Sequence, residues 1–223
     1  YARAAEIRGA WDARLEALVV DALVRGEVDD SLRSRAAALG WTGRGASIAV
    51  AGSAEPGMDD MRAVDLRRAA RRAAQDCLVG MQGDRIVVVL CGETDLAAAA
   101  AGLAPRFGPG PVVVGPRGQG LEGAALSVQA TLAGLTAAPA WPAAPLPVDA
   151  DELLPERVLV GDPTARATLL RAAFEPIATA GGSLLETLSA YLANGRSLEA
   201  AARGLYVHPN TVRYRLRRVA DVT

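Results

Sequence analysis

The sequence predicts an α+β domain followed by an all-α domain, with a helical segment ahead of both. Three observations carry this prediction. Residues 47–135 alternate short apolar runs with amphipathic stretches of helical period, the pattern of a sheet with packed helices. After a Pro/Ala-rich loop at 136–147, the periodic segments are helical. The 223 residues, 51% of them hydrophobic and 22% charged, suffice for one large or two small folded domains.

The first 40 residues predict two helices. The first covers 1–26, and its apolar stripe consists of Ile7, Trp11, Leu15, Leu18 and Leu23. The second covers 30–39 and stops at Gly40, with Asp29 and Asp30 placed to cap its start. Because the chain opens without Met, we expect it to be part of a longer protein. Three roles are open for the apolar stripe of the first helix: it packs on its own domain, it links to a preceding domain, or it pairs with a second copy. We assign 1–40 to linker or dimerisation helices.

Residues 41–150 predict the sheet domain. The expected elements, in order, are strand 47–51, helix 59–75, strands 77–80 and 85–90 joined by a hairpin turn, helix 94–106, strand 111–114, helix 121–135 and an edge strand at 146–148. This order favours an antiparallel sheet with helices on one face. The run from Ile86 to Leu90 is continuously apolar, as in a strand buried on both faces.

Residues 151–223 predict a bundle of short helices. Asp162 and Pro163 are typical of a cap and first residue, for a helix that reaches Ala173. The break at 181–183 places Ser183 as the cap of the next helix, which ends at Asn194-Gly195. Ser197 caps a short helix over 198–205, and after a tight turn His208 and Pro209 begin the last one. One face of that helix carries Val212, Leu216 and Val219, and the other face is polar.

Charge is divided unevenly along the chain. All 24 basic residues are arginine; residues 196–223 hold six of them against two acids, which leaves the rest with 18 arginines and 23 acids. The segment 203–218 has five arginines and no acid. Two interpretations of this basic segment are a helical hairpin that only packs, with a solvated face, and a helix-turn-helix that binds DNA. The acid-free charge, the caps that fix a short turn and the polar front favour a second helix that enters the major groove of double-stranded DNA. The predicted DNA-binding residues are Ser197, Arg203, His208, Pro209, Asn210, Thr211, Arg213, Tyr214, Arg215, Arg217 and Arg218.

Several chemistries are excluded by composition. Without lysine the chain has neither a Schiff base nor the lysine of a phosphate-binding P-loop. His208 is the sole histidine, and Cys77 and Cys91 lack the spacing of zinc ligands, so we expect no metal site, no cofactor and no enzyme. The two cysteines, the absence of a signal peptide and the lack of an apolar run long enough for a membrane span lead us to expect a cytoplasmic location.

The C-terminal segments resemble a known family. Leu184–Leu192, Ser197–Arg203 and His208–Val219 are similar to the C-terminal helix-turn-helix of PucR/CdaR-type bacterial transcription regulators. Tyr206 stands where many such turns have glycine. The resemblance implies a homodimer on operator DNA, read by the helix 208–219, and the alanine- and arginine-rich composition suggests an actinobacterial relative of regulators of fatty-acid synthesis.

The sheet region resembles the degenerate GGDEF-like domain of these regulators, a ferredoxin-like α/β sandwich. Active diguanylate cyclases have Gly-Gly-Asp-Glu-Phe in a hairpin where this chain has Gln82-Gly83-Asp84-Arg85-Ile86. Arginine thus replaces the acid that binds metal, and the first strand ends without a carboxylate. The resemblance implies a catalytically inactive module for dimerisation or sensing. A residual nucleotide cyclase and a sensor that binds a small molecule are the alternatives.

Two further patterns in the sheet region concern phosphate. Arg67, Arg68, Arg71 and Arg72 recur at helical spacing, for which a solvated face is favoured over a phosphate site. The stretch 115–120, Gly-Pro-Arg-Gly-Gln-Gly, weakly resembles a phosphate loop ahead of a helix.

Overall fold

The computed structural model describes the backbone of residues 2–54 and 60–223, and the side chains of 11–54 and 64–223. It divides into two compact units, the first ending at Ala165 and the second covering Arg166–Thr223. The N-terminal helices and the helix after residue 150 both belong to the first unit. In the described part of the chain, no helix is long and apolar enough to cross a membrane.

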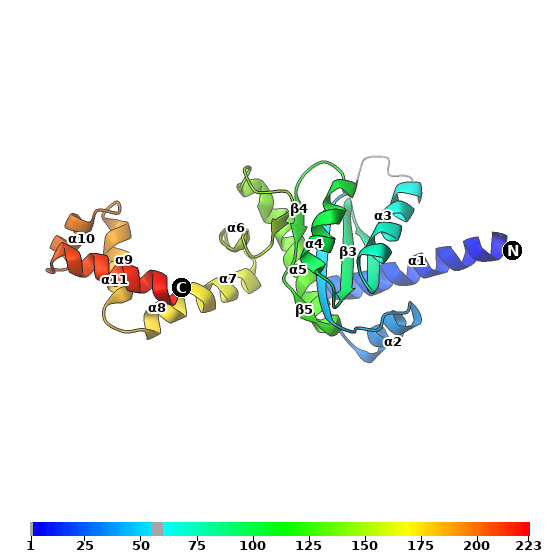
Figure 1. Cartoon of the computed structure of the whole chain (residues 1–223), viewed down its shortest axis with the longest axis horizontal. Helices are drawn as coiled ribbons and strands as arrows, with labels where there is room; N and C mark the ends of the chain where they lie inside the picture. Colours follow the sequence, from blue (N-terminus) through cyan, green and yellow to red (C-terminus); the bar gives the residue numbers. More distant parts are fainter. Residues whose placement is uncertain (1, 55–59) are drawn as a thin grey trace. The chain divides into compact units, whose positions relative to one another are not determined.

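A mixed sheet forms the centre of the first unit (Figure 1). Its strands are β1 (Ala46–Ser53), β2 (Asp76–Gln82), β3 (Arg85–Gly92), β4 (Val112–Val114), β5 (Gly118–Gln119) and β6 (Val148–Asp149). The order is β2-β3-β1-β4-β6, with β5 also pairing with β1. The pairs of β1, β2 and β3 are antiparallel, as predicted, whereas β4 and β6 run parallel. The short β5 was not predicted, since two residues give no periodic signal.

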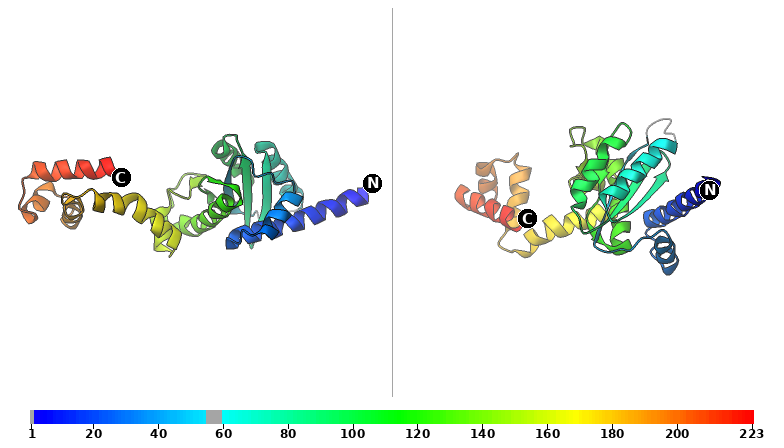
Figure 2. Two further views of the ribbon diagram at one scale, coloured as in Figure 1. Left: turned by 90° about the horizontal axis from the view of Figure 1, so that it is seen from below. Right: turned by 45° about the vertical axis from the view of Figure 1, so that its right-hand side comes forward.

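Helices cover both faces of this sheet, so the predicted single helical face is wrong (Figures 1 and 2). The helices are α1 (Ala2–Arg25), α2 (Asp30–Ala38), α3 (Asp60–Ala73), α4 (Leu96–Leu103), α5 (Gly120–Ala137) and α6 (Leu154–Leu159). One hydrophobic cluster joins α1, α2 and α5 to the sheet, and a second joins α3 and α4 to its other face. The physical reason lies in β3: Val87 and Val89 enter the first cluster, while Val88 and Leu90 enter the second. A strand apolar at every position needs a helical layer on each side.

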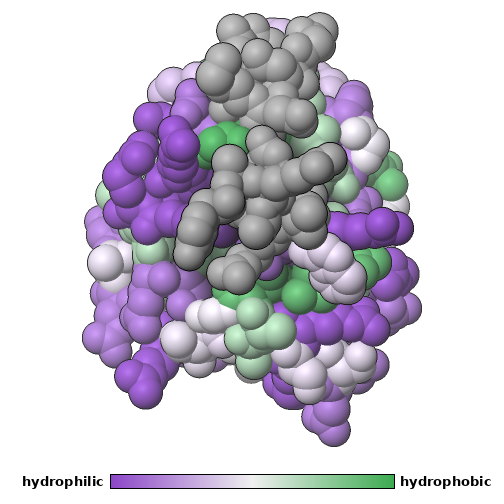
Figure 3. Space-filling model, turned by 90° about the vertical axis from the view of Figure 1, so that its right-hand side faces the viewer, coloured by the Kyte–Doolittle hydropathy of each residue, from purple (hydrophilic) through white to green (hydrophobic). Residues whose placement is uncertain are grey.

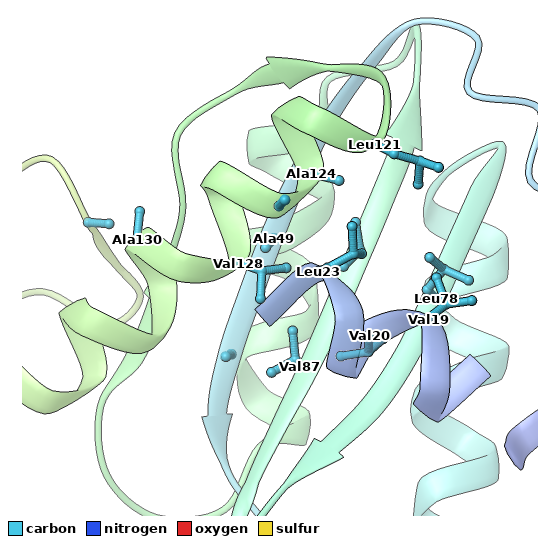
Figure 4. Close-up of a cluster of buried hydrophobic side chains, with 14 of the residues drawn as sticks. Val19, Val20, Leu23, Ala49, Leu78, Val87, Leu121, Ala124, Val128 and Ala130 are labelled. Carbon is cyan, nitrogen blue, oxygen red and sulfur yellow. The ribbon is translucent and has the colours of Figure 1, made fainter. Parts of the chain in front are cut away.

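The first cluster brings α1 onto the sheet beside α5 (Figure 4). Val19, Val20 and Leu23 of α1 lie over Leu78 and Val87 and are fully buried. The close approach requires a glycine at position 80, because a Cβ there would stand 2.7 Å from the Cβ of Val20. Of the alternatives for the N-terminal stripe, packing on its own domain therefore holds for the C-terminal half of α1. The predicted residues Tyr1 and Asp59, and the side chain of Ile7, lie outside the described set.

Two polar groups are built into this interface. The Ala49 N–H of β1 donates to Ser127 Oγ of α5 at 2.8 Å, and the Ala49 carbonyl accepts from the Gly115 N–H at 2.8 Å. Glu16 of α1 accepts from the Val79 N–H at 3.0 Å and from Arg67 Nε at 2.9 Å. Burial raises the pKa of Glu16, against the opposing effect of the Arg67 bond. The visible outer surface in Figure 3 is mostly hydrophilic, with smaller hydrophobic areas.

A buried arginine closes the C-terminal end of the first unit. Arg157, on helix α6, is 2% exposed and donates to Asp162 Oδ2 at 2.9 and 3.0 Å and to the Ala150 carbonyl at 2.9 Å. The other oxygen of Asp162 accepts from the N–H groups of Thr164 and Ala165, which confirms it as a cap. Partial burial of Asp162 acts in the opposite direction, but these hydrogen bonds and Arg157 lower its pKa.

The second unit is helical, with a small core. Its elements are α7 (Pro163–Leu169, which begins just before the unit), a π-helical segment (Leu170–Phe174), α8 (Glu175–Thr179), α9 (Leu184–Ala193), α10 (Leu198–Gly204) and α11 (Pro209–Val222). Ala201, Ala202 and Val212 are its buried centre, with Leu198 and Leu216 among the partly buried residues around them. Ser183 occupies the expected cap position but makes no capping bond, because its left-handed backbone (φ 62°) is not the extended conformation a cap uses.

Candidate nucleic-acid interface

The helix-turn-helix is formed by α10 and α11, and side-chain caps fix both helix starts. Ser197 Oγ accepts from the Ala200 N–H at 3.2 Å, and His208 Nδ1 accepts from the Asn210 N–H at 3.2 Å. Pro209 is the first residue of α11, where its missing N–H costs nothing. The two predicted caps are confirmed. They fix the turn between the helices to Leu205, Tyr206 and Val207.

That turn depends on a left-handed residue. Tyr206 has φ 55°, while the Leu205 and Val207 N–H groups donate to the carbonyls of Ala201 and Ala202 at 3.0 Å. This is the geometry in which glycine is normally found, since the Cβ of other residues clashes there. The Tyr206 side chain is 96% exposed, so its ring makes little packing contact to compensate for the strain. The sequence identified Tyr206 as a departure from glycine, but gave no signal that the ring would be exposed.

The outward face of α11 is basic and polar. Asn210, Arg213, Tyr214, Arg217 and Arg218 are exposed, and Tyr214 is 63% exposed. Arg213 Nη1 donates to Asn210 Oδ1 at 2.7 Å, so these two polar groups are presented together one turn into the helix. On the opposite side, Val212 is fully buried against α10. The predicted division of α11 into a core stripe and a polar front is confirmed.

Not every predicted residue lies on this front. Arg215 is half-buried and donates from Nη1 to Thr187 Oγ1 at 3.1 Å, and Thr187 is fully buried on α9. Its guanidinium therefore joins α11 to α9, whereas the sequence predicted it as a DNA-binding residue. Thr211 and Pro209 are half-buried at the start of α11, and Arg203 is exposed near the end of α10. The predicted residues that lie outward on the two helices are thus Arg203, Asn210, Arg213, Tyr214, Arg217 and Arg218.

The hairpin between β2 and β3 corresponds to the cyclase signature. Gly83 has φ 63° in its turn, and the Asp84 carbonyl accepts from the Ala54 N–H at 2.7 Å. Arg85 Nη1 donates to the Leu132 carbonyl at 3.4 Å and to Thr136 Oγ1 at 3.3 Å, both on α5. The residue that replaces the metal-binding acid is thus a packing contact. Within residues 11–54 and 64–223, no three His, Cys, Asp or Glu side chains gather as metal ligands would.

The glycines of the stretch 115–120 allow close packing between backbone segments, and this packing explains them without a phosphate site. A Cβ on Gly115 would stand 2.4 Å from the Ser127 carbonyl oxygen, and one on Gly118 would stand 2.4 Å from the Cα of Gly123. Both glycines thus allow β4, β5 and α5 to approach closely.

Together, a helix-turn-helix with a basic front and a sheet unit with a degenerate cyclase hairpin define a class of protein: bacterial regulators built from these two modules.

Comparison with known proteins agrees with both modules. Residues 184–223 match the PucR C-terminal helix-turn-helix domain, and residues 25–137 match the GGDEF-like domain. The crystal structure of a regulator of polyketide synthase expression from Bifidobacterium adolescentis is similar, with a TM-score of 0.83 and 32% identity over 94% of this chain and 84% of that one. The chain therefore belongs to the PucR-type family of transcription regulators that carry a GGDEF-like domain.

The sequence relatives are mycobacterial. Uncharacterized proteins of Mycobacterium tuberculosis and Mycobacterium bovis are 43% identical over 232 aligned residues, which cover all of this chain and 56% of theirs. The chain spans little more than half the length of these relatives. The expected actinobacterial relationship is confirmed by them.

Proposed function

We propose that this chain recognises operator DNA by placing α11 in the major groove. The observation that carries the proposal is the exposed, basic front of α11 over residues 210–218, which contains no acid, is capped at its start by His208 and is backed by Val212. An α-helix fits the major groove, and arginine forks match guanine O6/N7 or a phosphate. The family to which the chain belongs and the helix-turn-helix match support it.

The residues of this face have separate roles in the proposal. Asn210, Arg213 and Arg217 lie at the groove and read bases, and Tyr214 packs on sugar or on a thymine methyl group. Arg203 and Arg218 bind phosphate, which fixes orientation without reading sequence. Ser197, His208, Pro209 and Thr211 hold the helix starts, and Arg215 positions α11 through Thr187.

A homodimer would present two copies of α11 to half-sites about 34 Å apart, or a multiple of that spacing. The outer side of α1 offers one surface for pairing, since Trp11 is 70% exposed and Leu18 is 48% exposed on it. In this proposal the sheet unit pairs protomers or senses a small molecule, and the chain acts in the cytoplasm, where its DNA is.

Fluorescence anisotropy with labelled promoter fragments tests the reading helix. We expect Arg213→Ala with Arg217→Ala to weaken specific binding by about 1–3 kcal/mol per base-reading arginine. The matched control is Arg166→Ala with Arg171→Ala, which removes the same charge from exposed positions of the second unit outside the motif. Full specific binding by the first double variant would remove α11 from its assigned role.

We further propose that the sheet unit has no cyclase activity. Arg85 occupies the acid position and faces α5. Burial raises the pKa of both Cys77 and Cys91 to about 11, so neither thiol is a nucleophile at neutral pH. Incubation with GTP and Mg²⁺ should give no cyclic product by mass spectrometry, and formation of a cyclic product would contradict the proposal.

A further inference from the structure

A cleft of about 580 Å³ opens on the face of the sheet that α3 and α4 cover. It lies between α3 and the segment that follows α4. This is the face opposite to α5, on which Arg85 is anchored. The lining residues are Asp65, Leu66, Arg68, Arg72, Pro105, Arg106 and Phe107.

The cleft is lined mainly by positive charge, although its unit has a net negative charge. Residues 1–165 contain 16 arginines and 21 acids, a net charge of −5, yet among the side chains that the structure describes three arginines line one cleft with a single acid. That acid, Asp65, is 4.0 Å from Arg68 Nη1, at the outer limit of an ion pair, and both side chains are about two-thirds exposed. An exposed pair at this distance neutralises little of the charge.

The arginines of α3 lie on two different sides of the helix. Arg67 binds the buried Glu16, and Arg71 lines a different cavity with Glu16 and Cys77. Arg68 and Arg72 point to the other side, where Arg106 joins them from a separate segment. The four-arginine pattern in the sequence therefore divides into a pair on the side of Glu16 and a pair that faces the cleft. Arg106 could not be added from the sequence, because it lies more than thirty positions along the chain.

The lining also includes fixed apolar groups. Leu66 is 1% exposed and Phe107 is 8% exposed. The Phe107 ring lies against the backbone of β1, since a Cβ on Gly52 would stand 2.9 Å from ring carbons. The cleft thus offers guanidinium groups beside a fixed aromatic side chain, and its volume falls in the range of small-molecule sites.

We propose that this cleft binds a small metabolite that carries at least two phosphoryl groups. Each guanidinium presents a planar fork to an oxyanion, and three forks that come from two segments of the chain match the oxygens of two adjacent phosphoryl groups. The inference does not depend on DNA binding by α11, because the cleft lies wholly within the first unit.

Isothermal titration calorimetry of the full chain with sodium pyrophosphate tests this site. We expect binding that is tighter than that of inorganic phosphate. Arg72→Gln and Arg106→Gln should each weaken it by about tenfold, the loss of one charge-assisted contact. The matched control is Arg71→Gln, which removes the same charge from the neighbouring position of α3 and should change the affinity less than about twofold.

Three outcomes would overturn the proposal. They are no pyrophosphate binding at millimolar concentration, equal affinity in the two cleft variants and the wild type, and an equal loss in Arg71→Gln, which would indicate a general charge effect. The variant Arg213→Ala with Arg217→Ala separates the two sites. It should keep its pyrophosphate affinity while losing DNA, and loss of pyrophosphate binding there would place the anion on the helix-turn-helix instead.

Discussion

The two units of this chain use the same residue, arginine, in different ways. In the sheet unit three arginines bind within the fold: Arg157 is buried with Asp162, and the partly exposed Arg67 and Arg85 bind Glu16 and the backbone of α5. In the helical unit Arg213, Arg217 and Arg218 remain exposed on α11, and Arg215 is the exception that packs. The difference shows that charge identifies a binding face only where the fold does not use it for packing.

The units also differ in core and in backbone strain. The sheet unit has two large hydrophobic clusters, whereas the helical unit has three buried hydrophobic residues at its centre. Outside glycine, the described positive-φ residues are Ser183, Arg196 and Tyr206, which all belong to the helical unit. A small core with strained turns indicates that this unit is the less stable of the two.

The largest expected effect is on the sheet unit. Asp162→Ala should lower the free energy of unfolding by about 3 kcal/mol, because it leaves the buried Arg157 unpaired and removes the cap of α7. Urea unfolding followed by tryptophan fluorescence measures this, since Trp11, Trp41 and Trp141 all lie in the sheet unit. Asp151→Ala is the control, because Asp151 is exposed and 4.0 Å from Arg157, and it should cost less than about 0.5 kcal/mol.

The same variant gives a pH prediction. The pKa of Asp162 is below its ordinary 3.8 in the folded chain, so its stabilisation is complete above that value and is lost as the pH falls through the lowered pKa. The stability difference between wild type and Asp162→Ala should therefore be constant near neutrality and shrink below about pH 4. A difference that grows on acidification would contradict the assigned ion pair.

The next effect should be confined to the helical unit. Ala202→Leu adds three heavy atoms where α10 and α11 cross and should cost about 2 kcal/mol by overpacking. Helical circular dichroism should show a transition at lower urea, while tryptophan fluorescence should not shift. Ala220→Leu, at an exposed position of α11, is the control. A coupled shift of both signals would show that the two units unfold together.

A smaller effect should have the opposite sign. Tyr206→Gly should raise the stability of the helical unit by about 1 kcal/mol, because glycine accepts φ 55° without strain and the exposed ring packs on little. We expect weaker DNA binding from the same variant, since strain of this kind persists where a side chain serves a function. Thermal unfolding and anisotropy measure the two quantities, and a destabilised variant would show that the ring contributes to packing.

The smallest effect concerns the start of α11. His208→Ala should cost about 0.5 kcal/mol through loss of the bond from the Asn210 N–H, and His208→Asn should restore it. Guanidinium unfolding of the two variants distinguishes the cap from other roles of the imidazole. Equal stability of both variants would mean that Pro209 alone fixes the helix start.

The sequence predicted what local chemistry determines. The caps at Asp29, Asp162, Ser197 and His208 were correct, because each places an acceptor beside free N–H groups whatever the tertiary structure. The helix expected to end at Ala173 instead continues as a π-helical segment. Pro176 lies two residues past this segment, in the first turn of α8, where it has no N–H to donate to the carbonyl of Ala172.

The features that the sequence did not predict depend on distant residues. The second helical layer follows from which helix reaches which face of β3, and the inward turn of Arg215 depends on Thr187, 28 positions earlier. For the candidate site, the sequence identified the segment, the caps and most of the outward residues. It could not show that Tyr206 would project into solvent, because exposure is decided by the angle at which α10 and α11 cross.

The hydrogen bond from Ala49 to Ser127 has a consequence for how this chain can vary in length. The Ser127 hydroxyl accepts from the Ala49 N–H, which has no partner in a neighbouring strand. This bond fixes both the rotation of α5 about its axis and its position along β1. One residue inserted between Gly120 and Ser127 would turn the hydroxyl by about 100° and orphan the N–H at the centre of the sheet. Insertions should be tolerated in the loop at 136–147, which follows Ser127 in the chain. Insertions within the first two turns of α5 should destabilise the fold.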